Sequence, residues 1–210
     1  MIKENYEQIK KEVGSDVTVI AVTKYHTVEE TLQAYDAGIR HFGENRVEGF
    51  LEKLSALPED AEIHYIGTLQ SRKVKDVAPY LTYLHSLERE SVAKKIDKYA
   101  EHDVKCFVQV NISHEETKHG VEPEALEAFV EKISEYDKIN IIGLMTMAPY
   151  TEDEEVLDQT FRKLKELRDQ LNINYPSITE LSMGMSNDYL HAVKEGATYV
   201  RIGSKIMGSR

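Results

Sequence analysis

Short runs of β-branched and other apolar residues alternate along the chain with longer segments in which apolar residues recur every three or four positions. Such runs are typical of strands, and such segments are typical of amphipathic helices. The predicted strands are 17–23, 41–45, 63–67, 83–87, 104–112, 139–147, 178–183 and 198–202. The predicted helices are 4–13 before the first strand and then 28–37, 47–57, 73–80, 91–102, one beginning near Pro123, 152–171 and 187–195.

Strand–helix units that follow one another in this way predict a parallel sheet. Several strands, such as 17–23 (VTVIAVT), are apolar on both faces, as burial under helices requires. The chain has 210 residues, which leaves only about 26 for each unit. We therefore predict a single, compact (β/α)8 barrel of the TIM type over residues 1–210, with one extra N-terminal helix. A doubly wound open sheet is the competing architecture.

Local signals mark the starts and buried faces of several helices. Thr27 and Glu30 have the spacing of a capping box, and so do Thr151 and Glu154. Pro123 suits a first helical position. A stripe in the longest helix is predicted to pack on the barrel; it consists of Leu157, Phe161, Leu164, Leu167 and Leu171.

Composition and charge narrow the class of protein. The net charge of −11 disfavours a general binder of nucleic acid, although a local anion site remains possible. The single cysteine, Cys106, excludes an intramolecular disulfide, and its apolar surroundings favour a packing role over a reactive thiol. The N-terminus lacks a signal-peptide core, and no apolar run is long enough for a membrane span. We expect a cytoplasmic protein that is not associated with membranes, and a monomer.

In barrels of this type, chemistry takes place at the C-terminal ends of the strands and in the loops that follow. Lys24 comes directly after the first apolar run. Enclosed by apolar neighbours at the barrel mouth, its amine would have a lowered pKa and would be nucleophilic near neutral pH. By position alone, a strand-end lysine that points into water is the more common case.

The loops after the seventh and eighth strands form the recurrent phosphate site of this fold. The first, 182–186, reads SMGMS, and the second, 201–204, reads RIGS. Gly184 and Gly203 would allow the backbone to approach an anion closely, and Ser186 and Ser204 would add hydroxyl donors. A helix beginning at Asn187 would point free N–H groups at the anion. The alternative is that the glycines serve only their turns.

A lysine that forms a Schiff base opposite a phosphate site suits either a sugar phosphate or pyridoxal 5′-phosphate. Arg201, at the end of the eighth strand, favours the second ligand. An arginine that faces the pyridine nitrogen keeps this nitrogen unprotonated, because a second positive charge nearby is disfavoured. The alternative is that Arg201 binds phosphate or pairs with an acid.

Other patterns carry less chemistry. His114 and His119 frame HEETKH, which differs from the zinc-binding HExxH pattern because its histidines are five positions apart, and no third ligand is evident. We therefore predict no metal. His64 and His85 lie in predicted strands and are interpreted as core or rim residues.

Motifs along the whole chain resemble those of the pyridoxal phosphate homeostasis proteins of the YggS/PROSC type. They are AVTKY (21–25), HFGENRV (41–47), HYIGTLQSRK (64–73), GLMTM (143–147), LSMGMSNDY (181–189) and VRIGSKIMG (200–208). Arg72 stands where this family is expected to carry asparagine, so the role of the loop from Thr68 to Arg72 is left open. The family's fold is similar to the N-terminal barrel of alanine racemase.

The resemblance implies that the chain binds pyridoxal 5′-phosphate as a Schiff base on Lys24 and takes part in homeostasis of the cofactor inside the cell. It implies a cofactor site in which Arg201 faces the pyridine nitrogen and Asn45 lies beside the cofactor. The phosphate would be held by Ser182, Ser186, Gly203 and Ser204. It implies no catalytic residue and no dedicated turnover, and it makes apo forms of pyridoxal phosphate enzymes candidate partners. The alternatives are a minimal amino-acid racemase and a class I aldolase-like enzyme acting on a sugar phosphate.

Overall fold

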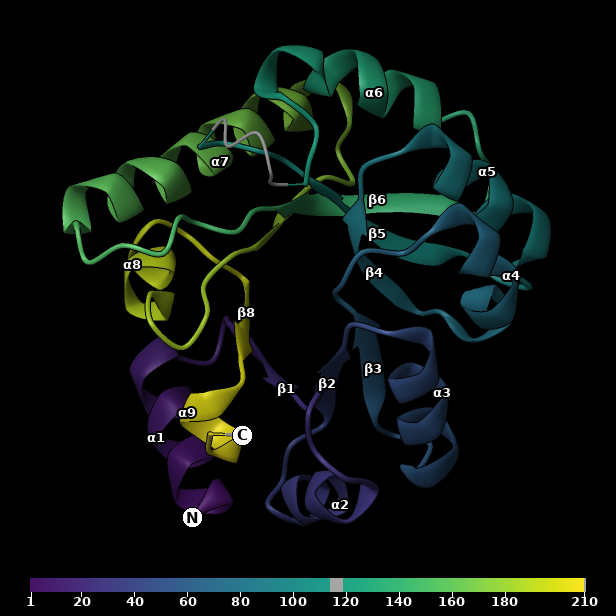
Figure 1. Cartoon of the computed structure of the whole chain (residues 1–210). Coiled ribbons are helices and arrows are strands. Elements are labelled where there is room, and N and C mark those ends of the chain that lie inside the picture. Colours follow the sequence, from purple (N-terminus) through teal and green to yellow (C-terminus); the bar gives the residue numbers. More distant parts are fainter. Residues whose placement is uncertain (114–118, 210) are drawn as a thin grey trace.

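The computed structural model describes residues 1–113 and 119–209, in which eight parallel strands close into a barrel surrounded by helices (Figure 1). The strands follow one another around the barrel in chain order, and β1 completes the ring by pairing with β8. The predicted barrel is confirmed, and the open sheet is ruled out because an open sheet would leave β1 and β8 as unpaired edges.

The strand bounds agree closely with the sequence pattern. The strands are β1 Thr18–Val22, β2 His41–Glu44, β3 Glu62–Tyr65, β4 Tyr83–Leu87, β5 Val104–Gln109, β6 Ile139–Met145, β7 Glu180–Ser182 and β8 Tyr199–Ile202. Each strand ends at or before the residue where its apolar run gives way to polar residues. Because all neighbouring strands are parallel, their C-terminal ends lie at the same end of the barrel, where the candidate residues are concentrated.

Helices cover the outside of the ring. They are α1 Ile2–Val13, α2 Val28–Asp36, α3 Val47–Ala56, α4 Val74–Val77, α5 Glu90–Tyr99, α6 Leu126–Ile133, α7 Glu154–Asn174, α8 Tyr189–Lys194 and α9 Ser204–Met207 in the described part of the chain. The extra N-terminal helix is α1, and it lies beside α9 near the other end of the chain (Figure 1). Asn5 Nδ2 donates to the carbonyl oxygen of Ile206 at 3.1 Å and joins the two helices.

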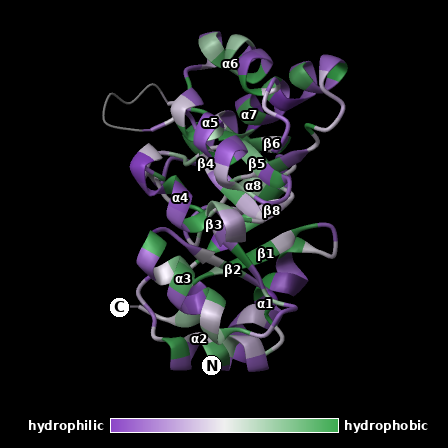
Figure 2. Ribbon diagram, turned by 90° about the vertical axis from the view of Figure 1, so that its right-hand side faces the viewer, coloured by the Kyte–Doolittle hydropathy of each residue, from purple (hydrophilic) through white to green (hydrophobic). Residues whose placement is uncertain are grey.

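Apolar side chains form two buried layers. The larger layer lies between the barrel and its helices, and it includes the predicted stripe of α7 from Leu157 to Leu171. The smaller layer lies inside the barrel and consists of the side chains of Tyr83, Phe107 and Met145. Figure 2 shows the corresponding pattern, with apolar colours along the strands and mixed colours on the surrounding helices. Cys106 is fully buried in the first layer, as predicted, and burial raises the pKa of its thiol.

Two helical segments differ from the expectations. The segment 73–80 is a short α4 flanked by 3-10 turns at Ser71–Lys73 and Ala78–Tyr80, because Pro79 lacks the N–H group that would continue an α-helix. The helix expected from Asn187 begins instead at Tyr189 and has only 6 residues. The C-terminal turn of helix, α9, was not predicted.

One of the two predicted capping boxes is wrong. The box of Thr27 and Glu30 is present at α2. At α7 the cap is Asp153, whose carboxylate accepts hydrogen bonds from the backbone N–H groups of Glu155 and Val156. Thr151 instead accepts from the backbone N–H of Asp153 at 3.1 Å. A carboxylate is the stronger acceptor for the positive end of the helix, and Asp153 stands directly before the first turn.

Replacing Thr27 with alanine is expected to lower the free energy of unfolding by about 1 kcal/mol. The Thr27 hydroxyl accepts from the Glu30 backbone N–H at 3.1 Å, and alanine leaves that group without its acceptor. Urea unfolding followed by circular dichroism measures the change. Thr151→Ala is the matched control, because Thr151 does not cap its helix. Equal losses in the two variants would contradict the assignment of the cap.

Within residues 1–113 and 119–209, none of the helices combines the length and the apolar character that crossing a bilayer requires.

Candidate functional site

A cleft of about 330 Å³ opens at the C-terminal ends of β1, β7 and β8. Its walls include Lys24 from the segment after β1, Ser186 from the segment after β7, and Arg201, Gly203 and Ser204 from β8 and the start of α9. The first of these segments is far from the other two in the sequence, and closure of the barrel between β1 and β8 brings it beside them. The cleft contains most of the side chains that sequence analysis selected.

Lys24 lies two residues beyond the end of β1, in a turn closed by a 2.9 Å hydrogen bond from the His26 backbone N–H to the carbonyl oxygen of Thr23. Its side chain is exposed, and Nζ lies 5.1 Å from the centre of the Tyr25 ring. The apolar enclosure expected around Lys24 is therefore absent. The amine lines the cleft and is open to a ligand that enters from solvent.

The backbone that carries Lys24 is held by a buried ion pair. The carboxylate of Glu44 lies 3.0 Å from Lys53 Nζ, and it accepts a hydrogen bond of 2.5 Å from the Thr23 hydroxyl. Lys53 Nζ also donates to the carbonyl oxygen of Thr23 at 3.3 Å. Both charged side chains are almost fully buried. The sequence patterns did not reveal this pair, because Lys53 lies in a helix with the ordinary charge pattern of a surface helix.

Arg201 forms the buried end of the cleft. Its side chain is 3% exposed, and two hydrogen bonds orient it. Nη1 donates to the Ser182 hydroxyl at 2.5 Å, and Nη2 donates to the carbonyl oxygen of Thr146 at 3.1 Å. Burial lowers the pKa of Arg201 to about 10, while the nearby charge of Asp188 acts in the opposite direction. The guanidinium therefore remains a cation at neutral pH and presents a fixed positive charge to the cleft.

The predicted phosphate side combines the segments after β7 and β8. Ser186 Oγ accepts from the backbone N–H of Lys205 at 3.3 Å, which joins the first segment to the start of α9. A side chain at Gly203 would meet only Val22, at an ordinary distance of 3.6 Å, so packing does not demand glycine at this position. The missing side chain instead leaves the backbone of residues 203 and 204 open to the cleft.

Gly184 has a different role from Gly203. Its φ of 105° lies in the left-handed region, and an added Cβ would lie 2.8 Å from the Cβ of Ala192 in α8. For Gly184, the alternative that it serves the turn is therefore the better description. The helix after this turn is too short, and begins too late, to supply the strong dipole expected from a helix at Asn187.

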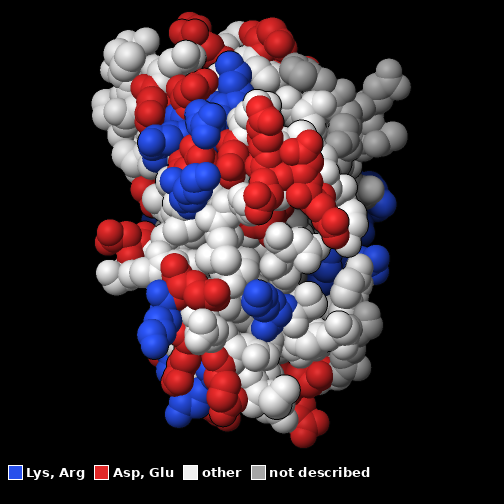
Figure 3. All heavy atoms as spheres, turned by 90° about the vertical axis from the view of Figure 1, so that its left-hand side faces the viewer, with Lys and Arg blue, Asp and Glu red and all other residues white. Residues whose placement is uncertain are grey.

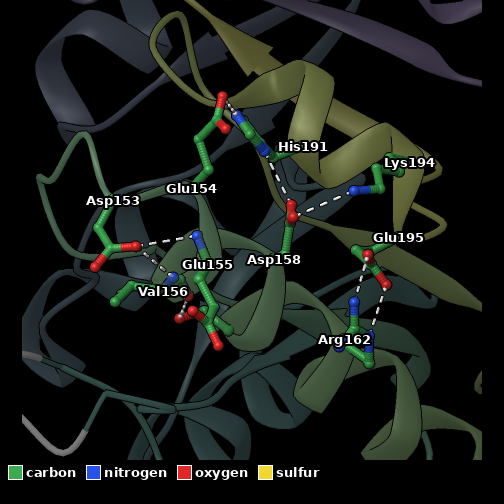
Figure 4. A network of polar contacts seen from close by, with 10 residues as sticks. Asp153, Glu154, Glu155, Val156, Asp158, Arg162, His191, Lys194 and Glu195 are labelled. Carbon is green, nitrogen blue, oxygen red and sulfur yellow. Dashed lines mark hydrogen bonds and ion pairs between the residues drawn. The ribbon is translucent and has the colours of Figure 1, made fainter.

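Polar contacts join α7 to α8, the helix that follows the segment after β7 (Figure 4). Asp158 of α7 lies 2.9 Å from His191 and 3.2 Å from Lys194 of α8, and Arg162 pairs with Glu195 at 3.2 Å. Just before α8, the Asp188 carboxylate accepts from the Met185 backbone N–H at 2.7 Å. These contacts fix the end of the loop that carries Ser186.

Two of the predicted cofactor residues do not line this cleft. Ser182 is fully buried beneath Arg201, to which it is hydrogen bonded. Asn45 lines a neighbouring cavity of about 450 Å³ together with Thr68 and Gln70 of the loop whose role was left open. The Cβ of Asn45 packs so closely against Gly67 that an added Cβ there would lie 2.4 Å away.

Metal binding has little support in the described residues. Within residues 1–113 and 119–209, no three histidine, cysteine or acidic side chains are grouped so that they could hold an ion. His119 Nδ1 lies 3.0 Å from Glu88. His114, the other histidine of HEETKH, lies outside the described residues. His64 and His85 are fully buried in the barrel, as the core interpretation predicted.

The donor set of the cleft fits an anionic aldehyde. Lys24 supplies a primary amine, the only common side-chain group that condenses with an aldehyde to a C=N bond. Arg201 supplies a fixed cation, and Ser186 and Ser204 supply hydroxyl groups beside an open stretch of backbone. Pyridoxal 5′-phosphate carries an aldehyde, a ring nitrogen and a phosphate, and the cleft offers a partner for each.

Comparisons with known proteins agree with this fit. A family model described as "Alanine racemase, N-terminal domain" matches residues 1–210. A protein of Aquifex aeolicus named "Pyridoxal phosphate homeostasis protein" is 42% identical over 199 residues, which cover 91% of this chain and 86% of that protein. A protein of the same name from Schizosaccharomyces pombe is 37% identical over 204 residues, covering 94% of this chain and 86% of that protein.

Solved structures give the same picture. PipY of Synechococcus elongatus PCC7942, solved with PLP bound, superposes with a TM-score of 0.91 at 33% identity, covering 99% of this chain and 100% of that one. Alanine racemase of Clostridium difficile 630 superposes with a TM-score of 0.84 at 16% identity, and 98% of this chain covers 56% of that one. At such low identity, the second similarity shows the fold alone.

Proposed function

The chain belongs to the family of the pyridoxal phosphate homeostasis proteins, and from this premise we propose that it binds pyridoxal 5′-phosphate covalently through Lys24 and takes part in homeostasis of the cofactor inside the cell. The observation that carries the proposal is the shared cleft of Lys24 and Arg201 beside the hydroxyl groups of Ser186 and Ser204. The PLP bound to the related PipY supports it.

The cofactor supplies an aldehyde that condenses with a primary amine with loss of water. The protein's part is to bind and orient it. Lys24 provides the amine at the open side of the cleft, and Arg201 provides a cation at the buried side. A positive charge that faces the ring nitrogen disfavours protonation of that nitrogen and so weakens the cofactor as an electron sink. Ser186, Ser204 and the backbone at Gly203 would hold the phosphate.

The cleft is open to solvent at Lys24, which favours a protein that binds and releases the cofactor over an enzyme with dedicated turnover. Because the Lys24 side chain is exposed, a cofactor held there would be accessible to a free amine or to the lysine of another protein. A racemase would need a second acid/base group on the opposite face of the cofactor. Apo forms of pyridoxal phosphate enzymes are the proposed recipients.

We also propose that the protein acts as a monomer in the cytoplasm and that nucleic acid and membranes are not among its partners. On the face shown in Figure 3, basic and acidic side chains lie in intermixed groups, and the chain carries a net charge of −11. On that face, the described residues form no continuous basic patch of the kind by which proteins gather on polyanions.

Replacing Lys24 with alanine is expected to abolish covalent binding of the cofactor. Purified protein mixed with pyridoxal 5′-phosphate should show a visible absorbance band that disappears on reduction with borohydride, after which mass spectrometry should find the adduct on Lys24. The Lys24→Ala variant should show neither. Lys98→Ala is the matched control, because Lys98 lies beside Tyr99 at 5.2 Å as Lys24 lies beside Tyr25, but belongs to α5 and does not line the cleft.

Other outcomes would decide between the alternatives. A wild-type protein without a band, even with excess cofactor, would overturn the assignment, and borohydride trapping of a sugar phosphate on Lys24 would favour the aldolase-like reading. Steady conversion of one amino acid between its enantiomers, lost in Lys24→Ala, would establish the racemase.

A further inference from the structure

A chain of hydrogen-bonded side chains crosses the interior of the barrel from the N-terminal end of β2 to the cleft. His41 Nδ1 lies 2.9 Å from His64 Nε2, and His64 Nδ1 lies 2.9 Å from His85 Nε2. His85 Nδ1 lies 2.8 Å from the Ser182 hydroxyl, which accepts from Arg201. We call these residues, His41, His64, His85, Ser182 and Arg201, the histidine column.

The column runs through the interior and not along the sheet. His85 belongs to β4 and Ser182 to β7, and β5 and β6 lie between these strands in the ring. A contact of 2.8 Å between them is possible only across the barrel. His41 begins β2 and is half-buried, whereas Ser182 ends β7 and lies beneath the cleft. One end of the column is therefore near solvent and the other touches the candidate site.

Burial determines the charge state of the central histidines. His64 and His85 are fully buried, and desolvation is the main reason that their pKa values lie well below the ordinary value for histidine. Both rings are therefore neutral near pH 7. A neutral imidazole carries one N–H donor and one acceptor nitrogen, so each ring must donate on one side and accept on the other. The column can then point in only two directions.

The serine selects one of these directions. Arg201 can only donate, so Ser182 Oγ must accept from it and has one hydrogen of its own to place. If that hydrogen goes to His85 Nδ1, then His85 Nε2–H donates to His64, and His64 Nε2–H donates to His41. In the opposite direction His85 donates to Ser182. The serine hydrogen then has no acceptor, because His85 and Arg201 are its hydrogen-bond partners in the described part of the chain.

We propose that the histidine column is a directional hydrogen-bond relay that orients Arg201 and transmits the protonation state of His41, at the far end of the barrel, to the Ser182 hydroxyl beneath the cleft. In this relay, His64, His85 and Ser182 are positioning residues. The inference goes beyond the function proposed above and does not depend on it, since every contact in the column belongs to the ligand-free chain.

Protonation of His41 reverses the relay. A doubly protonated ring has no acceptor nitrogen, so His41 Nδ1–H must donate to His64 Nε2. His64 then donates through Nδ1 to His85, and His85 donates through Nδ1 to Ser182. The serine hydrogen is released from His85 and turns away from the column. A proton taken up at one end thus changes which way a hydroxyl points at the other end.

Aromatic rings pack against the inner histidines of the column, and charged groups beside the column affect the pH at which it reverses. The ring of His64 stacks on Tyr83 at 4.1 Å, and the ring of His85 stacks on Phe107 at 4.2 Å. Tyr199 packs against both histidines. The charged groups that act on the column are Glu62 beside His41, Lys105 beside His64, and Arg201 beside His85.

These groups place the reversal on the acid side of neutrality. Desolvation lowers the pKa of His41, and the negative charge of Glu62 opposes this effect in part. Reversal is therefore expected below about pH 6.5, the ordinary value for histidine.

Nitrogen NMR of ligand-free protein labelled with 15N-histidine tests the relay. Near pH 7.5, His64 and His85 are expected to carry their proton on Nε2. As the pH falls, both should change to the Nδ1–H form with the same midpoint as the protonation of His41. His41→Gln, which cannot be protonated, should abolish this change, and His41→Asn provides a second variant should glutamine not fit. His102→Gln alters an exposed histidine outside the column and should leave the change intact.

Two results would overturn the proposal. One is an Nδ1–H form of His64 or His85 near pH 7.5. The other is titration of His41 while the two inner rings keep their tautomers, in samples that circular dichroism shows to be folded. Neither result depends on whether pyridoxal 5′-phosphate binds to Lys24, so a failure of the relay and a failure of the proposed function are distinguishable.

Discussion

Replacing Lys53 with methionine is expected to lower the free energy of unfolding by about 3–5 kcal/mol. Methionine fills nearly the same space but leaves the Glu44 carboxylate, which is 1% exposed, without its cation. An uncompensated charge in the interior is among the costliest single changes in a protein, because the ion loses its hydration and receives no partner in return. Urea unfolding followed by circular dichroism measures the loss.

Two control variants test whether the loss of stability comes from breaking the buried ion pair of Lys53 and Glu44. Lys53 Nζ also lies 3.8 Å from Glu52, whose side chain is 59% exposed. Removal of that partner in Glu52→Gln should change the free energy of unfolding by less than about 0.5 kcal/mol. The double variant Lys53→Met with Glu44→Leu removes both charges and should recover a large part of the loss. A loss below about 1 kcal/mol in Lys53→Met would show that the pair is not the anchor of the Lys24 turn.

The second large effect is expected in acid. Between about pH 6.5 and 5.5, the free energy of unfolding should fall by about 1 kcal/mol for each buried neutral histidine, and by about 2 kcal/mol for His64 and His85 together. The folded chain keeps these rings neutral because burial depresses their pKa values. The unfolded chain releases them to water, where they take up protons below about pH 6.5.

The direction of this change in the free energy of unfolding follows from proton uptake. Below this pH the unfolded state binds more protons than the folded state, so acid favours unfolding, and the stabilisation is complete only above the ordinary histidine pKa. Urea titrations at pH 7.5, 6.5 and 5.5 measure the slope. His85→Gln should reduce the loss between pH 6.5 and 5.5 by about 1 kcal/mol, which is about half of it. A flat profile between pH 6.5 and 5.5 would contradict the burial of neutral rings.

The sequence was sufficient to predict the barrel because several strands are apolar on both faces and strand-like runs alternate with helical segments along the whole chain. The run VTVIAVT became β1, which is one residue shorter at each end, and the run VKCFVQVNI became β5, which is shorter at its C-terminal end. Helix ends were harder to predict, since they depend on local competition. Asp153 displaced Thr151 as the cap of α7, and Pro79 broke the segment after β3 into short turns.

The cleft was predictable because fold geometry assigns the loops after β7 and β8 to phosphate and because the family motifs lie there. The two residues outside the cleft show the limit of that reasoning. Ser182 and Ser186 look alike in SMGMS, but a side chain at the end of β7 points into the barrel, and one four positions later lies at the cleft. Only the register of the strands distinguishes them.

The buried polar contacts could not be predicted from single residues. Lys53 occupies a helix in which lysine usually faces water, and its partner Glu44 lies on another element. The three histidines of the column come from consecutive strands, at intervals of 23 and 21 residues. This recurrence, close to one strand–helix unit, was the available signal, and it becomes meaningful only after the barrel has been recognised.

The pairing of β1 with β8 has a consequence for how the chain is made. Thr18 lies opposite Tyr199, about 180 positions further along the chain. At roughly 5–20 residues per second, a ribosome needs roughly 10–40 s to synthesise that interval. During this time, the free edge of β1 has no strand on one side, and such edges are the usual starting points of aggregation. The barrel closes only after synthesis has reached β8, so the edge of β1 stays without its second neighbour until then.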